Sequence, residues 1–385
     1  MLEKILEVQS MNMKYVKIFA FILVAVLITG IVAGCGNNQQ AGTANQAQGG
    51  TNQTQGGAAE STNGADQPLR VALIGRNFND GASVEDMAIG AARAEQDFNI
   101  VLSLLESSSP ATFEEDVLAM ARANDLVITA FPWMSDAVVS AANEFPDTMF
   151  SSIFQFINAG DQSVPNIWSS EFHGQAAFYI AGYIASQVTQ TNRIGLLIGG
   201  EEPTPNAEGN AFMRGVRRGN PDAVVNFAFI GSYEDPARGY EIAVAMISGG
   251  VDVLQTSAAA SNAGVVEAAM EAGVIVACEI TDYFDIYEGF MGIIGIGFGD
   301  TTYQSIRYFV EGNFPGGEHG IRDMSNGGYH IDWDSYLRFA DSHEFGANLR
   351  PVISSAQDIE RQILSGELVI DFDPTVPNWS RISQE

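Results

Sequence analysis

The sequence predicts an α/β protein whose parallel sheets are divided between two lobes. From Pro68 onward, short β-branched runs alternate with longer amphipathic segments, which is the pattern of doubly wound parallel sheets with helices on both faces. The strand-like runs are too numerous for one ordinary sheet, and the pattern breaks near Ser169 and Ser170. A chain of 385 residues with 46% hydrophobic positions has enough apolar material for two cores.

Each element is expected from the length and periodicity of its run. Short β-branched and aliphatic runs predict strands at 71–74, 100–104, 126–129, 149–153, 194–198, 224–230, 253–255, 274–278 and 292–296. Apolar residues at helical spacing predict helices at 84–96, 113–123, 135–144, 175–190, 207–219, 236–248, 264–272 and 301–312. In this class of fold the ligand lies outside the carboxyl ends of the strands, so the residues that follow each strand are the binding candidates.

The N-terminus has the outline of an export signal. Three lysines, the last of them Lys17, precede an uncharged apolar run from Ile18 to Gly34. Small residues stand immediately before Cys35, and this resembles the lipobox of bacterial lipoproteins. We therefore expect residues 1–34 to be a lipoprotein signal peptide and Cys35 to carry the lipid. A permanent membrane anchor is the alternative, because the run approaches the roughly 20 residues that span a bilayer.

The segment that follows has the composition of a flexible tether. Residues 36–67 contain no large apolar side chain and are rich in Gly, Asn, Gln and Thr. We expect a body held by lipid and the 35–67 tether on the extracytoplasmic face of a bacterial cell membrane. Its predicted parts are lobe I at 68–170 with a returning segment at about 275–300, lobe II at 171–274 with a returning segment at about 301–375, and a C-terminal tail at 376–385.

Composition excludes several classes of function. The formal net charge of −29 repels phosphate backbones, so nucleic acid is not an expected partner. Two cysteines, Cys35 and Cys278, and four histidines without ligand spacing predict no metal site. The chain has no G-x-S-x-G motif and no evident nucleophile with its base, so neither an enzyme nor a cofactor is expected. In the Gly295–Asp300 segment an acid stands where a dinucleotide fingerprint has its third glycine, which favours a simple crossover.

Several short motifs occur in the collinear order of one protein family. The most specific is Gly-Ser-Tyr-Glu-Asp-Pro-Ala-Arg-Gly at 231–239. The others are Phe78-Asn79-Asp80, Met134-Ser135-Asp136-Ala137, Phe145-Pro146-Asp147, the Gly174 to Tyr183 helix, and Gly199-Gly200 followed by Pro203. Together these motifs resemble the basic membrane protein family of ABC-transporter solute-binding lipoproteins, and the resemblance covers roughly residues 69–370.

The resemblance implies a type I periplasmic-binding-protein fold, with two α/β lobes joined by three crossovers that close on a solute. It implies a monomeric receptor that delivers a small solute, first of all a purine nucleoside, to an ABC permease. Two alternatives stay open: a ligand-sensing receptor that docks on a signalling protein, and an importer receptor for a non-nucleoside metabolite.

The resemblance also assigns binding roles. Phe78 is expected to stack on the base and Asn79 with Asp80 to read its edge, while Glu279, or Asp282 as a second candidate, holds the ribose hydroxyls. The remaining candidates are Trp133 as a second stacking ring, Met134, Ser261 and Asn262.

Structural roles are the alternatives for these residues. Phe78 and Trp133 also suit core or hinge positions, Asn79 and Asp80 suit a turn or helix cap, and Glu279 and Asp282 suit a solvated loop. A lysine that the family uses near Gly297 is absent, since no lysine follows Lys17.

Overall fold

The computed structural model describes residues 67–80, 82–160, 163–343 and 346–385. The predicted signal peptide, Cys35 and nearly all of the tether lie outside the described residues. Within the described ranges, no helix combines the length and the apolar character needed to cross a bilayer.

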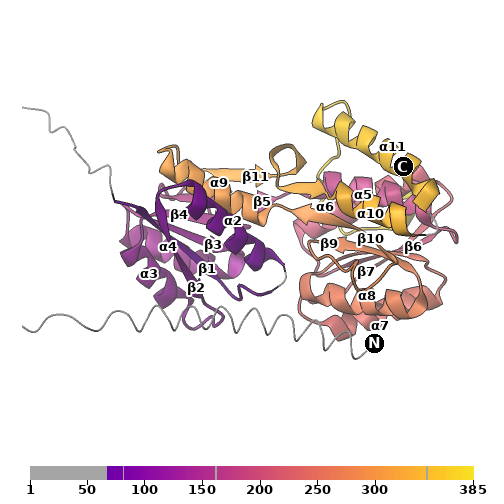
Figure 1. Cartoon of the computed structure of the whole chain (residues 1–385), viewed down its shortest axis with the longest axis horizontal. Coiled ribbons are helices and arrows are strands. Elements are labelled where there is room, and N and C mark those ends of the chain that lie inside the picture. The colour runs from indigo at the N-terminus through magenta and orange to yellow at the C-terminus, as the bar shows by residue number, and fades with distance from the viewer. Residues whose placement is uncertain (1–66, 81, 161–162, 344–345) are drawn as a thin grey trace, which may run out of the picture. The chain divides into compact units, whose positions relative to one another are not determined.

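The first lobe is built on a six-stranded, all-parallel sheet (Figure 1). The strand order is β11-β5-β4-β3-β1-β2. Its strands are β1 (Leu69–Gly75), β2 (Ile100–Glu106), β3 (Leu126–Ala130), β4 (Met149–Ile153), β5 (Ile167–Phe172) and β11 (His319–Arg322). Its helices are α2 (Ser83–Asp97), α3 (Phe113–Ala123), α4 (Ser135–Glu144) and α9 (Phe298–Val310).

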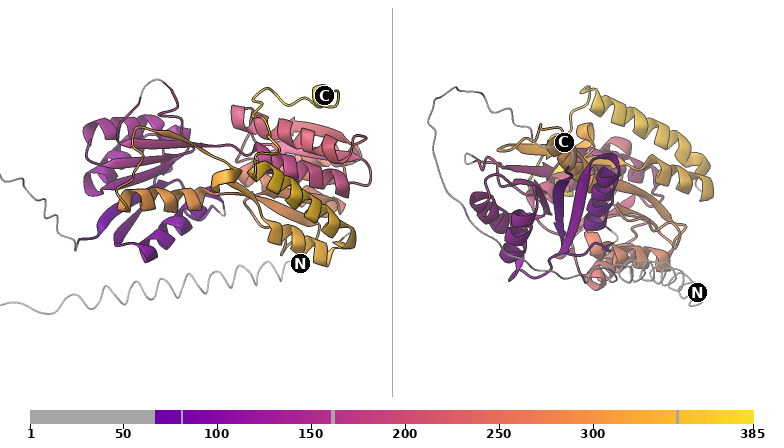
Figure 2. Two further views of the ribbon diagram at one scale, coloured as in Figure 1. Left: turned by 90° about the horizontal axis from the view of Figure 1, so that it is seen from above. Right: turned by 60° about the vertical axis from the view of Figure 1, so that its left-hand side comes forward.

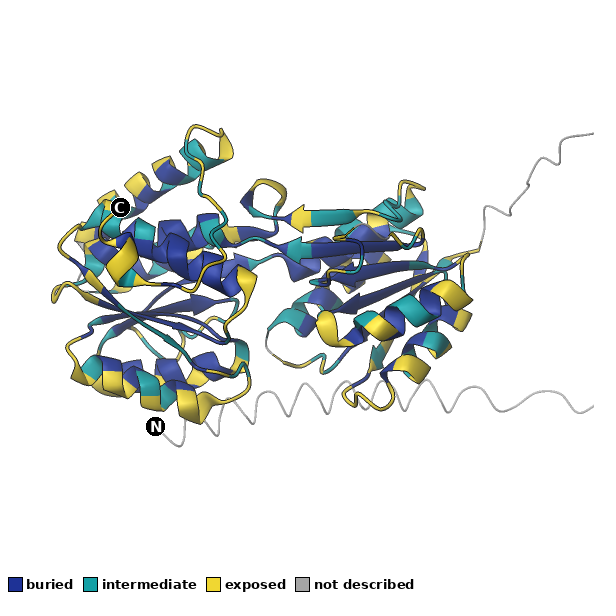
Figure 3. Ribbon diagram, turned by 180° about the vertical axis from the view of Figure 1, so that it is seen from behind, coloured by how far each residue is buried: buried dark blue, intermediate teal, exposed yellow. Residues whose placement is uncertain are grey.

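Apolar side chains on both faces of this sheet are covered by helices. Val71 and Leu73 of β1 belong to the same apolar cluster as Met87 of α2, whereas Ala72 and Ile74 belong to a second cluster with residues of α3 and α4. Successive side chains of a strand point to opposite faces, so one apolar run serves two cores. Figure 3 shows the strands of both sheets as largely buried.

The second lobe has a sheet of the same size with one antiparallel edge strand. The order is β12-β10-β9-β8-β6-β7, and only β12 runs against its neighbour. Its strands are β6 (Arg193–Ile198), β7 (Val224–Phe229), β8 (Val253–Ser257), β9 (Ile275–Glu279), β10 (Phe290–Ile296) and β12 (Tyr329–Ile331). Its helices are α5 (Gln175–Val188), α6 (Pro203–Gly219), α7 (Pro236–Ser248), α8 (Asn262–Ala272), α10 (Trp333–Ser342), α11 (Gly346–Leu364) and α12 (Trp379–Ile382).

The predicted α/β class with two parallel-sheet lobes is confirmed, and most elements lie where the sequence places them. Helices 113–123, 135–144 and 236–248 have the expected bounds. Helix α6 begins at Pro203 rather than at residue 207, since proline is well suited to the first position of a helix. The strands β5, β11 and β12 and the helices α10 to α12 were not predicted.

The predicted return to lobe I at about 275–300 is wrong, and the predicted return to lobe II at about 301–375 is wrong for residues 301–322. Residues 275–296 form β9 and β10 of the second sheet, where β9 pairs with β8 and β10 pairs with β9, because consecutive strands tend to remain neighbours. The chain then returns to the first lobe at residue 298, where α9 packs along α2 (Figure 2). A Cβ atom added at Gly90 of α2 would lie 2.0 Å from the carbonyl oxygen of Gly299, so the two helices touch through glycines.

Three crossovers therefore join the lobes, and aromatic rings pack them together. Phe172 lies on the first crossover and stacks on Phe298 of the second with ring centroids 4.8 Å apart. Tyr329, just after the third, meets Phe172 edge-on at 6.3 Å. Edge-on and offset stacked rings stabilise contacts beyond their buried area.

Candidate functional site

The strand orders single out two equivalent places for a ligand. In the first sheet the direction of strand addition reverses between β1 and β3, and in the second sheet it reverses between β6 and β8. Loops at the carboxyl ends of such a strand pair diverge, and ligands of open α/β sheets bind there. The residues around these strand ends, together with those of neighbouring strands and helices that reach them, form the two halves of the candidate site.

In the first lobe, aromatic and polar residues follow β1 and β3. Phe78 is half-buried against the core, and its backbone N–H donates to Glu106 Oε1 at 3.0 Å. Trp133 follows β3, stacks on Phe131 with centroids 4.6 Å apart, and leaves 43% of its surface exposed. An exposed indole at a switch point is a ready stacking surface for a planar ligand.

Arg76, the first residue after β1, links this half to the second lobe. Its guanidinium lies 4.9 Å from the centre of the Trp133 ring, and its Nη1 lies 3.3 Å from Glu234 Oε1. Glu234 belongs to the loop between β7 and α7. Sequence reasoning missed Arg76, although its position directly after the first strand is the kind of signal that marks a site residue.

Asp80 has a structural use that accounts for its carboxylate. Its Oδ1 accepts the backbone N–H groups of Ala82 and Glu85, and its Oδ2 accepts that of Val84. These are the donors that the start of α2 leaves unpaired. The neighbouring Asn79 is exposed, and its backbone N–H donates to the Asn77 side chain. The helix-cap alternative therefore explains Asp80.

Met134 lies in the core of the first lobe. Only 1% of its surface is exposed, and it belongs to the apolar cluster of α3, α4 and one face of the sheet. Packing alone accounts for it.

In the second lobe, Glu279 at the end of β9 is held by the loop after β8. Its Oε2 accepts the Ser257 hydroxyl at 2.7 Å, and its Oε1 accepts the backbone N–H of Ala259 at 3.3 Å. The residue is 7% exposed, and burial raises the pKa of its carboxyl despite these two donors. A solvated loop is not the environment of Glu279.

A second buried acid lies close to it. Glu208 of α6 is 3% exposed, and its Oε1 accepts the Tyr329 hydroxyl at 2.7 Å. Burial raises the pKa of Glu208 well above its ordinary value, and the charge of Glu279 adds to the effect. This half of the site therefore presents carboxyl groups that favour a hydrogen-bond donor or a cation as their partner.

Tyr233, from the motif at 231–239, covers the end of β6. A Cβ added at Gly199 would lie 2.2 Å from its ring, so only glycine lets the tyrosine lie against this strand end. Burial raises the pKa of the Tyr233 hydroxyl, and the charges of Glu202, Glu279 and Glu208 raise it further. The hydroxyl therefore stays protonated beside the acidic groups.

Ser261 and Asn262 stabilise the loops of this half of the site through hydrogen bonds. The Ser261 hydroxyl accepts the Asp235 backbone N–H at 2.9 Å and donates to the Ser232 carbonyl at 3.1 Å. Asn262 Oδ1 accepts the Thr256 hydroxyl and the Ala258 N–H, while its Nδ2 is buried without a hydrogen-bond partner among the described residues. Both residues hold the loops that carry Tyr233 and Ser257.

Asp282 makes none of these contacts. Its carboxylate pairs with Arg338 of α10 and accepts the Phe284 backbone N–H, and its side chain is 42% exposed. Of the two acids predicted after β9, only Glu279 is buried and held by the loop of a neighbouring strand.

Backbone strain collects at the same strand ends. Phe131, Phe154 and Ile280 follow β3, β4 and β9, and each has a positive φ, at 73°, 55° and 60°. Bulky residues avoid this region unless the surrounding structure holds them there, and such strain gathers at ligand sites. Nothing in the sequence reveals these conformations.

The described residues hold no group of three His, Cys, Asp or Glu side chains that could bind a metal ion. The amino terminus of α9, within the Gly295–Asp300 segment, already has an anion: the Asp86 carboxylate accepts the Gly299 N–H at 2.6 Å.

A sequence model of the PnrA-like ABC transporter substrate-binding proteins matches residues 70–371. The chain belongs to this family. It is 28% identical to basic membrane protein A of Borreliella burgdorferi over an alignment of 201 residues. This alignment covers 52% of this chain and 59% of that protein. The chain is 30% identical to the ABC transporter nucleoside-binding protein BmpA of Lactococcus lactis subsp. cremoris over an alignment of 132 residues. This alignment covers 34% of this chain and 36% of that protein.

Solved structures agree on the fold of this PnrA-like chain. A solute-binding protein of an ABC transporter system from Aeropyrum pernix K1 superposes with a TM-score of 0.64 at 20% identity, over 80% of this chain and 94% of that chain. The family is one of solute-binding receptors, as the motifs indicated. The alignments span less than two thirds of the curated relatives' own length.

Proposed function

We propose that this protein is the extracytoplasmic, lipid-anchored receptor of an ABC importer, and that it captures a purine nucleoside between its two lobes. The observation that carries the proposal is the pair of equivalent switch points, one lined by exposed and half-buried aromatic rings and the other by buried acceptors. Family membership supports the receptor role and a permease as its partner.

A nucleoside suits the chemistry of both halves. The base has two apolar faces, for which Trp133 and Phe78 offer rings at one switch point. The ribose has hydroxyl donors, for which Glu279 and Glu208 offer carboxyl acceptors at the other. In the absence of a lysine beyond Lys17, acceptors dominate the second half, and the ligand must supply the donors.

Thermal unfolding of the full-length protein in neutral detergent tests the ligand. Adenosine, guanosine and inosine are compared with free bases, ribose and amino acids. A ligand at 100 times its dissociation constant adds about 2.7 kcal/mol of stability, which is expected to raise the Tm by about 4 °C in a body of this size. If no nucleoside raises the Tm but a compound of another class does, the proposed nucleoside ligand is wrong while the proposed receptor role stands.

Two matched variants test the site. Glu279→Gln keeps the shape of the side chain but weakens acceptance from the ribose hydroxyls, so we expect a loss of affinity of at least about tenfold. Asp282→Asn removes the same charge from an exposed acid that pairs with Arg338, and we expect unchanged affinity. Equal losses in both variants would contradict the role of Glu279.

The anchor, the monomer and the transport role need separate measurements. Cys35→Ser is expected to abolish lipid labelling and to release the protein from the membrane fraction. Light scattering is expected to give the mass of one chain. Deletion of the gene is expected to remove uptake of the labelled nucleoside; retained uptake would contradict the importer role and favour a sensing receptor.

A further inference from the structure

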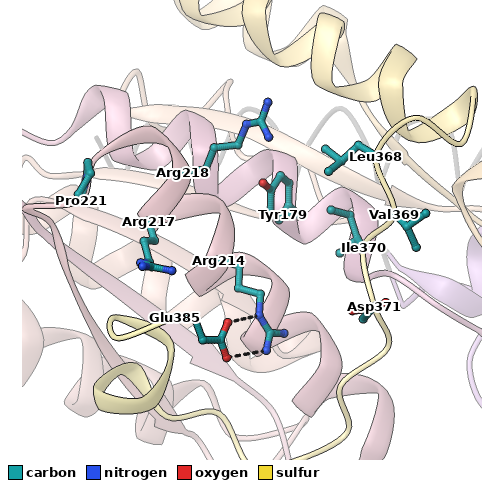
Figure 4. A pocket seen from close by; sticks show the side chains of 10 residues that line it. All are labelled: Tyr179, Arg214, Arg217, Arg218, Pro221, Leu368, Val369, Ile370, Asp371 and Glu385. Carbon is teal, nitrogen blue, oxygen red and sulfur yellow. Dashed lines mark hydrogen bonds and ion pairs between the residues drawn. The ribbon is translucent and has the colours of Figure 1, made fainter.

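The loops around the two switch points contain a single basic residue, Arg76. No lysine and no other arginine occurs in the loops that follow β1, β3, β6, β8 and β9. Arg214, Arg217 and Arg218 line a cavity of about 480 Å³ in the second lobe (Figure 4). They belong to the later turns of α6, which begins at the carboxyl end of β6, so they lie toward the end of the helix that points away from the site. Arg76 is therefore the guanidinium donor of the candidate site.

Two aromatic rings lie next to Arg76. The central carbon of its guanidinium lies 4.9 Å from the centre of the Trp133 ring. A Cβ atom added at Gly75, the preceding residue, would lie 3.1 Å from Cε1 of Phe78, so the Phe78 ring folds back against the start of the same loop. Much of the Trp133 surface is exposed. A base that stacks on the exposed part of this indole lies beside the guanidinium and turns one edge toward it.

Most N–H donors of Arg76 remain available to bind that edge. A guanidinium carries its donors in a planar fork that can form two parallel hydrogen bonds. Nη1 donates to Glu234 Oε1 at 3.3 Å, while Nε and Nη2 donate to no residue that the structure describes. The Arg76 side chain is partly exposed, so a ligand can reach these donors.

The charges around Arg76 favour an uncharged acceptor over an anion. Glu234 already balances the charge of the guanidinium, and the Ser232 hydroxyl fixes its loop by accepting the Glu234 backbone N–H at 3.0 Å. The second half of the site holds the carboxyl groups of Glu208 and Glu279 and has no basic residue in its strand-end loops, so it offers an anion no partner. Arg76 therefore suits a carbonyl oxygen or a ring nitrogen of a neutral ligand.

We infer that Arg76 selects 6-oxopurine nucleosides, such as inosine and guanosine, over adenosine. The inference rests on the proposed nucleoside site and adds the residue that distinguishes the bases. The O6 and N7 atoms of a 6-oxopurine are neighbouring acceptors, and a guanidinium fork binds them through two parallel N–H bonds. Adenine keeps N7 but has an amino group at position 6, and this donor faces the N–H donors of the guanidinium. Two bases of nearly the same size and shape are thereby told apart.

Calorimetric titration of the full-length protein in neutral detergent tests the selection without altering the protein. We expect inosine and guanosine to bind at least about tenfold more tightly than adenosine, which cannot form the paired contact. We expect 7-deazaguanosine, which has a C–H group in place of N7, to bind about tenfold more weakly than guanosine. Equal affinity within either comparison would overturn the inference and leave the nucleoside site standing. If no nucleoside binds, the proposed ligand and this inference are both wrong.

Three variants assign the selection to Arg76. Arg76→Met keeps a long side chain beside Trp133 but removes every donor, so the preference for inosine over adenosine is expected to disappear. Arg76→Lys keeps the charge but not the planar fork, and it is expected to retain only part of the preference.

Arg122→Met is the matched control. Arg122 also lies near an aromatic ring, 5.6 Å from the centre of Phe145, and 3.7 Å from Glu144, but it belongs to the last turn of α3, which precedes β3. This variant is expected to keep the full preference. A preference that survives in Arg76→Met, or that is lost equally in Arg122→Met, would overturn the role of Arg76.

Discussion

Replacing Glu208 by glutamine isolates the effect of a buried charge in the second lobe. The carboxyl is 3% exposed, and burial together with the charge of Glu279 raises its pKa well above the reference value of 4.5. Below pH 4.5 the group is protonated in both the folded and the unfolded protein and contributes nothing. As the pH rises, the unfolded chain releases the proton first, so the folded state loses stability until the pH passes the folded pKa.

The magnitude follows from linkage. Each unit by which the folded pKa exceeds the unfolded pKa costs about 1.4 kcal/mol of folding free energy at high pH. For a body of this size that corresponds to about 2 °C in Tm per unit. The Tm of Glu208→Gln minus that of the wild type is therefore expected to rise by at least about 2 °C between pH 4 and pH 8. Any stability difference caused by the new amide itself is the same at every pH, so it does not affect how the Tm difference changes with pH.

Differential scanning calorimetry at a series of pH values measures the effect, and Asp125 provides a control of opposite sign. A hydrogen bond from the Arg70 side chain lowers the pKa of Asp125, so its stabilisation is present above the unfolded pKa and disappears as the pH falls through the folded pKa. Asp125→Asn is expected to lose stability relative to the wild type as the pH rises from below the folded pKa to just above the reference value of 3.8, and to keep a constant difference at higher pH. A flat or falling difference for Glu208→Gln would refute the burial argument.

The other predictions concern packing and capping. Met134→Ala is expected to destabilise the protein by about 2–5 kcal/mol in urea titration while the folded fraction keeps its solute affinity; lost affinity without lost stability would indicate a ligand contact instead. Asp80→Ala is expected to cost about 1–2 kcal/mol through the lost donors of α2, and unchanged unfolding would show that the cap is unimportant. Gly90→Val is expected to cost about 1–3 kcal/mol or more, because its Cβ meets the Gly299 carbonyl, and a neutral result would mean that α9 shifts freely along α2.

The sequence is most informative where one local signal determines the structure. Periodicity gives α3, α4 and α7 their observed bounds, and an acid at the end of a buried strand draws attention to Glu279, whose role in binding stays a prediction. Sequence reasoning misses the short strands β11 and β12, because runs of three or four residues such as His319–Arg322 are too short to show a periodicity. They become strands only through neighbours far away in the chain, as the pairing of β11 with β5 shows.

The candidate site is less accessible to sequence reasoning, since its properties are set by tertiary contacts. The pairing of Glu208 with Tyr329 joins residues 121 positions apart, and no pattern along the chain predicts it. Asp80 and Asn262 have residue types that suit both a ligand contact and a structural bond, and only the donors around them distinguish the two. Residues 275–296 are predicted in the first lobe but lie in the second, and this outcome likewise depends on which strands they pair with.

The three crossovers also limit how this protein can be taken apart. The first lobe consists of residues 69–172 and 298–322, and the second consists of residues 175–296 together with the chain from 329 onward. A single cut between β1 and α11 therefore leaves at least one sheet without a strand or a covering helix. Exchanging a lobe with a relative requires three junctions, at 173, 297 and 323–328, and the stacked Phe172 and Phe298 beside two of them must be exchanged as a pair. The two lobes must therefore be expressed and redesigned together.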